Sequence, residues 1–123
     1  SDKEGVYKID FDLPWPVANR VTAVRALLEY IRSENTVLIS TQYEPDIINE
    51  TESILVTRIN SEWKITDVGD GTIDIYHAGF MDPAGTLPAW IANSGVKEGP
   101  VKTLRALRDI LPRYKSVTVS FLD

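Results

Sequence analysis

The sequence contains no cysteine, only one histidine and only one methionine among its 123 residues. The lack of cysteine excludes a disulfide framework, a thiolate nucleophile and a cysteine-based zinc site. One histidine does not make a metal site, and no Gly-x-Ser-x-Gly nucleophile motif is present. We therefore expect no cofactor, no metal and no enzymatic activity. A chain without cysteine fits a reducing cytoplasm, which is the location that we expect.

Basic residues are also scarce. Thirteen Lys and Arg stand against eighteen Asp and Glu, which gives a formal charge of -5 and a pI near 4.8. This balance provides no basic surface for nucleic acid and disfavours tight residence on an anionic membrane, so we expect transient membrane contact at most. No apolar run is long enough to cross a bilayer, and the acidic start lacks signal-peptide character, so we expect a soluble protein.

The composition is typical of one globular domain, with 43% hydrophobic and 25% charged residues. We therefore treat residues 1–123 as a single domain. The chain opens directly on a strand-like run with no helix start before it. We expect the domain to be incomplete at its N-terminus.

Short β-rich segments with turn residues between them fill the first two thirds of the chain. The segments are Val6–Asp12, Val37–Tyr43, Ser53–Ile59, Glu62–Asp67 and Thr72–Met81. Turn chemistry at Asn60-Ser61 and Asp70-Gly71 predicts two tight hairpins, and the spacing indicates an antiparallel meander. The stretch Val21–Arg32 is ambiguous, because it is rich in helix formers and yet has an apolar face at period two.

Apolar residues recur at helical spacing from Leu87 onward. We expect Thr86 to cap this helix, Gly95 and Gly99-Pro100 to kink or briefly break it, and Pro112 to end it. A last β-rich run, Val117–Leu122, has no obvious partner. Strands followed by one long amphipathic helix predict an α+β fold in which the helix covers one face of the sheet. A curved sheet that grips a helix can enclose an apolar cavity, where lipophilic ligands bind.

Three motifs resemble the START (steroidogenic-acute-regulatory-related lipid transfer) family, most closely its bacterial members. They are Leu13-Pro14-Trp15-Pro16-Val17 with Asn19-Arg20 after it, Glu62-Trp63-Lys64-Ile65, and Asp82-Pro83-Ala84-Gly85-Thr86-Leu87-Pro88-Ala89-Trp90-Ile91-Ala92-Asn93. The third is the most specific, because the family usually shows Asp-Pro-Gly-Gly and then Pro-x-Trp-Leu-x-Asn at the start of its C-terminal helix. The match extends from Val6 to about Leu111.

The resemblance implies a helix-grip fold, in which a curved antiparallel sheet wraps the C-terminal helix around a tunnel for one lipid or sterol. It also implies that Val21–Arg32 is a strand, against local propensity. The family's domain normally starts with a helix, three strands and two short helices, which are not found here. Ala84 in place of a glycine and Val21 in place of an acidic residue are smaller departures.

Two arginines and the histidine are the polar candidates for ligand binding. Arg58 shares a strand face with Ile54 and Val56 if the segment is one strand, and a buried arginine needs a carboxylate partner. Arg25 shares a face with Val21, Ala23 and Leu27. For both arginines, the alternative is an outer sheet face with the stem packed. For His77, a hydrogen bond to a ligand and a satisfied core position are both open.

The leading hypothesis is a carrier that binds, and possibly transfers, a lipid, sterol or other hydrophobic small molecule in an internal cavity. Its candidate ligand-binding residues are Arg25, Val56, Arg58, Ile75, His77, Met81, Leu87, Trp90, Ile91, Leu104 and Leu107. The alternatives are an aromatase- or cyclase-like enzyme that acts on a polyketide, with His77 as general base, and a regulatory or assembly module without a ligand. If the early strands are absent, an exposed sheet edge predicts a homodimer or strand exchange through Val117–Leu122.

Overall fold

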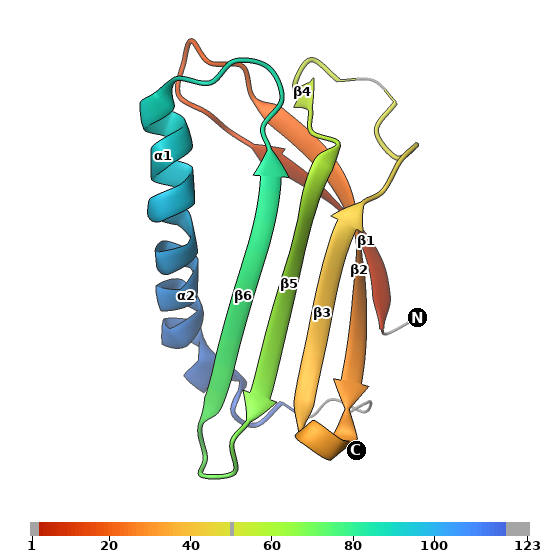
Figure 1. The fold of residues 1–123 in the computed structure, drawn as a ribbon, viewed down its shortest axis with the longest axis vertical. Coiled ribbons are helices and arrows are strands. Elements are labelled where there is room, and N and C mark those ends of the chain that lie inside the picture. Colours follow the sequence, from red (N-terminus) through yellow and green to blue (C-terminus); the bar gives the residue numbers. More distant parts are fainter. Residues whose placement is uncertain (1–2, 50, 118–123) are drawn as a thin grey trace. The chain divides into compact units, whose positions relative to one another are not determined.

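The computed structural model describes residues 3–49 and 51–117. It divides into two compact units, residues 1–85 with the strands and residues 86–123 with the two α-helices (Figure 1).

Unit 1 is a curved, mainly antiparallel sheet. Its strands are β1 (Glu4–Phe11), β2 (Arg20–Ile31), β3 (Thr36–Tyr43), β4 (Ile54–Leu55), β5 (Arg58–Asp67) and β6 (Ile73–Asp82). The order is β1-β2-β3-β5-β6, with each neighbouring pair antiparallel, and the short β4 pairs in parallel with β2. Figure 1 shows β3, β5 and β6 side by side as long strands. The sequence-based prediction of an antiparallel meander is therefore confirmed, with β4 as an addition.

The ambiguous stretch is a strand, as the resemblance implied. It forms β2 because β1 and β3 pair with it on both sides. Tertiary pairing of this kind overrides local helix propensity. The start of β2 also supplies most of the core, since Val21, Thr22, Ala23 and Val24 are all buried, as is Val56 just after β4.

The predicted hairpin at Asn60-Ser61 is wrong, and so is the single strand over Ser53–Ile59. β4 ends at Leu55, and β5 begins at Arg58 and continues through Asn60 and Ser61. The backbone stays extended there because β3 and β6 pair with it on both sides. The hairpin at Asp70-Gly71 is confirmed, and Gly69 and Gly71 both adopt positive φ values of 85°.

Alternation along the strands gives the sheet two chemically different faces. The ladder pairs Val24 with Tyr43, Ile39 with Trp63, and Trp63 with His77, so these residues share one face. We call it the apolar face; it comprises Tyr7, Ile9, Phe11, Thr22, Val24, Ala26, Leu28, Tyr30, Val37, Ile39, Thr41, Tyr43, Ile59, Ser61, Trp63, Ile65, Ile73, Ile75, His77, Gly79 and Met81. The opposite, charged face includes Glu4, Lys8, Asp10, Arg25, Glu29, Arg58, Glu62, Lys64, Asp74 and Asp82.

Unit 2 contains α1 (Ala89–Lys97) and α2 (Gly99–Ile110), followed by a 3-10 turn at Leu111–Tyr114. Pro88 occupies the N-cap position of α1, so the prediction that Thr86 caps this helix is wrong. The break at Gly99-Pro100 is confirmed, because proline fits the first turn of α2, while the helix continues through Gly95.

The end of α2 agrees with the predicted stop at Pro112, since this helix ends at Ile110. Apart from Val117, the run predicted at Val117–Leu122 lies outside the described residues. Neither α1 nor α2 combines the length and the apolar character needed to span a membrane, and the same holds for the rest of the described chain.

Candidate functional site

Trp63 and His77 form the aromatic centre of the apolar face. They are cross-strand partners on β5 and β6, and their rings stack with centroids 4.0 Å apart and planes inclined by 23°. The His77 Nδ1 atom lies 3.2 Å from the Glu62 carbonyl oxygen. A carbonyl oxygen only accepts hydrogen bonds, so Nδ1 carries the hydrogen and Nε2 of the neutral ring is an acceptor. Within the described part of the chain, Nε2 has no hydrogen-bond partner.

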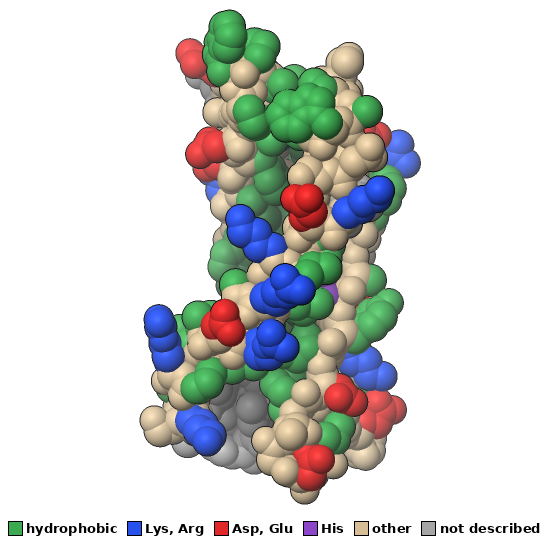
Figure 2. Space-filling view, turned by 90° about the vertical axis from the view of Figure 1, so that its left-hand side faces the viewer, with side chains coloured by type: hydrophobic (Ala, Val, Ile, Leu, Met, Phe, Trp, Pro, Cys, Tyr) green, Lys and Arg blue, Asp and Glu red, His purple; other side chains and the backbone are tan. Residues whose placement is uncertain are grey.

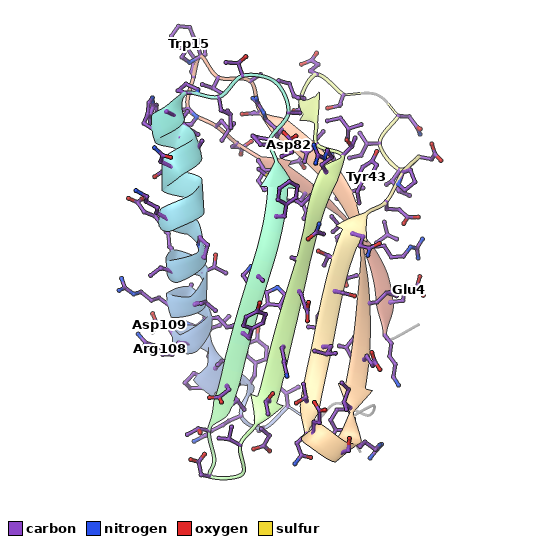
Figure 3. All side chains as sticks on the ribbon, in the orientation of Figure 1. Glu4, Trp15, Tyr43, Asp82, Arg108 and Asp109 are labelled. Atoms are coloured by element: carbon purple, nitrogen blue, oxygen red, sulfur yellow. The ribbon has the colours of Figure 1, made fainter. Side chains whose placement is uncertain are left out.

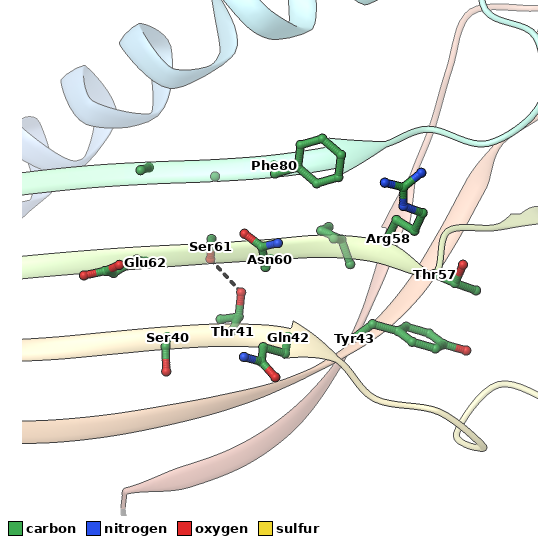
Figure 4. Close-up of a pocket in the computed structure, with 13 residues that line it drawn as sticks. Ser40, Thr41, Gln42, Tyr43, Thr57, Arg58, Asn60, Ser61, Glu62 and Phe80 are labelled. Carbon is green, nitrogen blue, oxygen red and sulfur yellow. Dashed lines mark hydrogen bonds between the residues drawn. The ribbon is translucent and has the colours of Figure 1, made fainter.

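A pair of hydroxyl groups lies beside this aromatic centre. Thr41 Oγ1 and Ser61 Oγ are 2.6 Å apart across β3 and β5 (Figure 4). Ser61 is also paired with Gly79, which lies two residues beyond His77 on β6. These two hydroxyl groups therefore lie in the row of the sheet next to the Trp63–His77 pair.

Arg25 lies on the charged face, which is the alternative left open by the sequence. Its guanidinium binds the Glu44 carboxylate through two hydrogen bonds, Nε to Oε2 at 2.9 Å and Nη2 to Oε1 at 2.7 Å, and also contacts Glu4. Hydrogen bonding to Arg25 holds the pKa of Glu44 below its ordinary value, and the same bond raises the pKa of Arg25. Arg25 therefore ties β2 to the residue that follows β3, and it faces away from the apolar side chains.

Arg58 is exposed on the charged face, which is the alternative that the sequence left open, and it does not share a buried face with Ile54 and Val56. The chain bends between β4 and β5, which breaks the period-two relation between these residues. The Arg58 side chain is 71% exposed, with Nη1 at 3.4 Å from Asp82 Oδ2 and the guanidinium 5.8 Å from the centre of the Phe80 ring.

A hollow of about 740 Å³ lies over β3, β5 and β6 (Figure 4). Most of its lining residues belong to the charged face: Ser40, Gln42, Arg58, Asn60, Glu62, Ala78 and Phe80. Such a mixed polar and charged lining does not suit a hydrophobic ligand. We therefore place the candidate site on the apolar face.

The other predicted site residues fall into three groups. Ile75 and Met81 lie on the apolar face of β6 with His77. Val56 is fully buried, and its backbone bonds to Val21 and to the Thr22 hydroxyl, so it belongs to the core. The remaining residues are in unit 2: Leu87, Trp90, Ile91, Leu104 and Leu107.

Sequence reasoning missed the contribution of Thr41 and Ser61. Ser61 was assigned to a turn because Asn and Ser favour turns. The alternation of Ile59, Ser61, Trp63 and Ile65 was the signal that could have placed it in a strand.

The first and third resemblance motifs meet in one turn at the end of β6. The buried Arg20 donates hydrogen bonds to the carbonyl oxygens of Pro83 at 3.1 Å and Ala84 at 2.9 Å. Asp82, labelled in Figure 3, accepts a hydrogen bond from the Ala84 amide at 3.0 Å and so orders the turn. The described residues contain no group of three or more His, Cys, Asp or Glu that could hold a metal ion.

Comparisons with known proteins agree with this fold. No family model matches the chain. An uncharacterized protein of Pseudomonas aeruginosa is 33% identical over 98 residues, which are 79% of this chain and 48% of that protein. The chain thus spans about half the length of this curated relative.

Two solved structures are similar over most of the chain. A STAR-related lipid transfer protein from Xanthomonas axonopodis aligns with a TM-score of 0.75 and 28% identity, over 91% of this chain and 63% of that one. Human STARD10 aligns with a TM-score of 0.74 and 16% identity, over 94% of this chain and 48% of that one, which shows the fold alone. The structural neighbours of this chain are therefore STAR-related lipid transfer proteins, and the chain has their START-like helix-grip fold.

Proposed function

We propose that this chain binds a lipid, sterol or other hydrophobic small molecule on the apolar face of its sheet and carries it between membranes. The observation that supports binding is the chemistry of this face. Arg20 lies at one end of the apolar face and Asp67 at the other. Between them, the described strands place no Lys, Arg, Asp or Glu side chain on this face. Burial of apolar ligand surface there supplies about 25 cal/mol per Å² before entropic costs. The neighbour from Xanthomonas axonopodis is named as a lipid transfer protein, which agrees with this role.

Two adjacent residues on β6 allow a matched test of the proposal. Ile75 points to the apolar face and Tyr76 to the charged face. We expect Ile75→Gln to weaken binding of the uncharged apolar dye Nile red about tenfold, because a loss of roughly 50 Å² of apolar contact is worth about 1.3 kcal/mol. Tyr76→Gln is expected to leave the affinity unchanged. Equal effects of the two substitutions on Nile red titrations would contradict the assignment of the site.

Binding without catalysis is part of the proposal. His77 is the residue that an enzyme of the polyketide-cyclase type would use as general base. Its replacement by Ala is expected to cost a carrier only a small part of its ligand affinity. Turnover of a polyketide substrate that His77→Ala abolishes would favour the enzyme instead.

Transfer requires contact with membranes, and two features favour such contact. Trp15 projects from the loop between β1 and β2 with 92% of its surface exposed (Figure 3), and indole rings prefer the membrane interface. In unit 2, Lys102, Arg105 and Arg108 are exposed on α2. Figure 2 shows Lys and Arg side chains, with some Asp and Glu among them, on the face that it draws.

Homodimer formation is a separate proposal. Among the described strands, β6 pairs only with β5, so no described strand pairs with its outer edge. Exposed edges of this length favour pairing with another strand. Light scattering after size-exclusion chromatography is expected to give twice the mass of the chain, and a monomeric mass would contradict the proposal.

A further inference from the structure

We infer that the preferred ligand is an uncharged lipid that carries a hydroxyl group and donates it to Nε2 of His77. This inference rests on the proposed function and specifies the chemical class of its ligand. Three features of His77 support it: the tautomer of the ring, the charges around the ring and the space beside the ring.

The state of the ring is fixed by two contacts. The stack on Trp63, at 4.0 Å between centroids, holds its plane, and the bond from Nδ1 to the Glu62 carbonyl selects the tautomer. The neutral ring then presents a lone pair at Nε2, which accepts a hydrogen bond and cannot donate one. A hydroxyl hydrogen suits this atom, whereas an ester or ionised carboxylate offers only acceptors.

The charges around the ring point to the same ligand class. An ionised head group needs a cation when it is buried, because an unpaired buried charge is costly. Arg25 and Arg58 are on the opposite face, where they pair with Glu44 and Asp82. Arg20, at the start of β2, donates to the main-chain carbonyls of Pro83 and Ala84. The strands therefore bring no lysine or arginine beside His77.

Space for the head group exists next to the ring. Gly79 follows His77 on the same face, and a methyl group at Gly79 would lie 3.8 Å from Cε1 of His77, the carbon between the two ring nitrogens. The edge of the ring is thus turned toward the position where Gly79 has no side chain. The Thr41 and Ser61 hydroxyls lie in the same row of the sheet. One of their two hydrogens is used within the pair, and the other is available to the ligand oxygen.

Three lipids with the same eighteen-carbon chain test this inference. Oleyl alcohol donates a hydrogen bond, methyl oleate only accepts, and oleic acid at pH 8 is an anion. We expect oleyl alcohol to displace Nile red with an affinity about threefold to tenfold higher than methyl oleate, which is the effect of one hydrogen bond, and oleate to be the weakest. His77→Phe keeps the ring stack and removes the acceptor, so it is expected to reduce the alcohol to the affinity of the ester. Tyr76→Phe, which removes a hydroxyl from the charged face, serves as the control.

Each outcome separates the inference from the proposed function. Equal binding of alcohol and ester, or tighter binding of oleate, would overturn the inference and leave the carrier function standing. A preference for the alcohol that persists in His77→Phe would also overturn it. Failure of all three lipids and of Nile red to bind the unmodified protein would overturn both.

Discussion

Arg20 carries a full charge and yet has only 1% of its surface exposed. Its guanidinium donates hydrogen bonds to the carbonyl oxygen of Ala18, just before β2. It also donates to the carbonyl oxygens of Pro83 and Ala84, which follow β6 and are far away in the sequence. Carbonyl oxygens accept these bonds without an extra charge. Arg20 therefore fastens the turn at the end of β6 to the start of β2.

Replacement of Arg20 by Met is expected to lower the free energy of unfolding by about 3 kcal/mol, because buried carbonyl groups lose charged donors. Arg58→Met is the matched control, since the Arg58 side chain is 71% exposed and its loss is expected to cost less than about 0.5 kcal/mol. Urea unfolding of the three proteins measures the difference. A similar loss for both variants would contradict the fastening role.

The Arg25–Glu44 pair joins secondary-structure elements, since Arg25 lies on β2 and Glu44 directly follows β3. The pKa of Glu44 is lower in the folded protein than its ordinary value of 4.5 because of the hydrogen bonds from Arg25. The resulting stabilisation is fully present above pH 4.5 and is lost as the pH falls through the lowered pKa.

Glu44→Gln is therefore expected to flatten the loss of stability that sets in as the pH falls below 4.5, and to cost stability at pH 7. Glu62→Gln is the control, because Glu62 lies on β5 and belongs to the same charged face of the sheet as Arg25. Urea unfolding at a series of pH values gives the two curves. If the wild-type and Glu44→Gln proteins lose stability in parallel on acidification, Glu44 is not the titrating group.

The sequence predicted elements well where one pattern acted alone and poorly where two competed. Alternation identified β1, β-rich composition between turn residues identified β3 and β6, and turn glycines located the hairpin before β6. β5 was broken at Asn60-Ser61 because turn propensity was given more weight than the alternation that continues through it, and only pairing on both sides decides such a case. Ile75 and His77 share one face of β6, as the alternation predicted. For Arg58 the sequence left two faces open, because the bend before β5 has no clear sequence signal.

The net charge of the whole molecule conceals an uneven distribution. Residues 1–85 contain seven basic and fifteen acidic residues, whereas residues 86–123 contain six basic and three acidic residues. The formal charge of -5 suggested no basic surface, but the average hides the excess of basic residues in unit 2. Local fields of this kind attract anionic surfaces at low salt.

We expect the protein to sediment with anionic phosphatidylserine vesicles at low ionic strength and to be released by about 0.5 M salt, because the Debye length then falls to a few ångströms. The double substitution Lys102→Glu with Arg105→Glu is expected to abolish sedimentation. The same change of charge at Lys8 and Lys64, on the charged face of the sheet, is expected to have little effect. Equal loss in both double variants would show that only the total charge matters.

Photo-crosslinking tests the central claim most directly, because it reports which face of the sheet a lipid touches. A fatty alcohol with a diazirine in its chain is bound to the protein and activated by light, and the modified residues are identified by peptide mass spectrometry. We predict adducts at apolar-face positions of β5 and β6, among them Trp63, Ile75 and Met81. Adducts at Tyr76, Phe80 and other residues of the charged face, with none at those positions, would contradict the account.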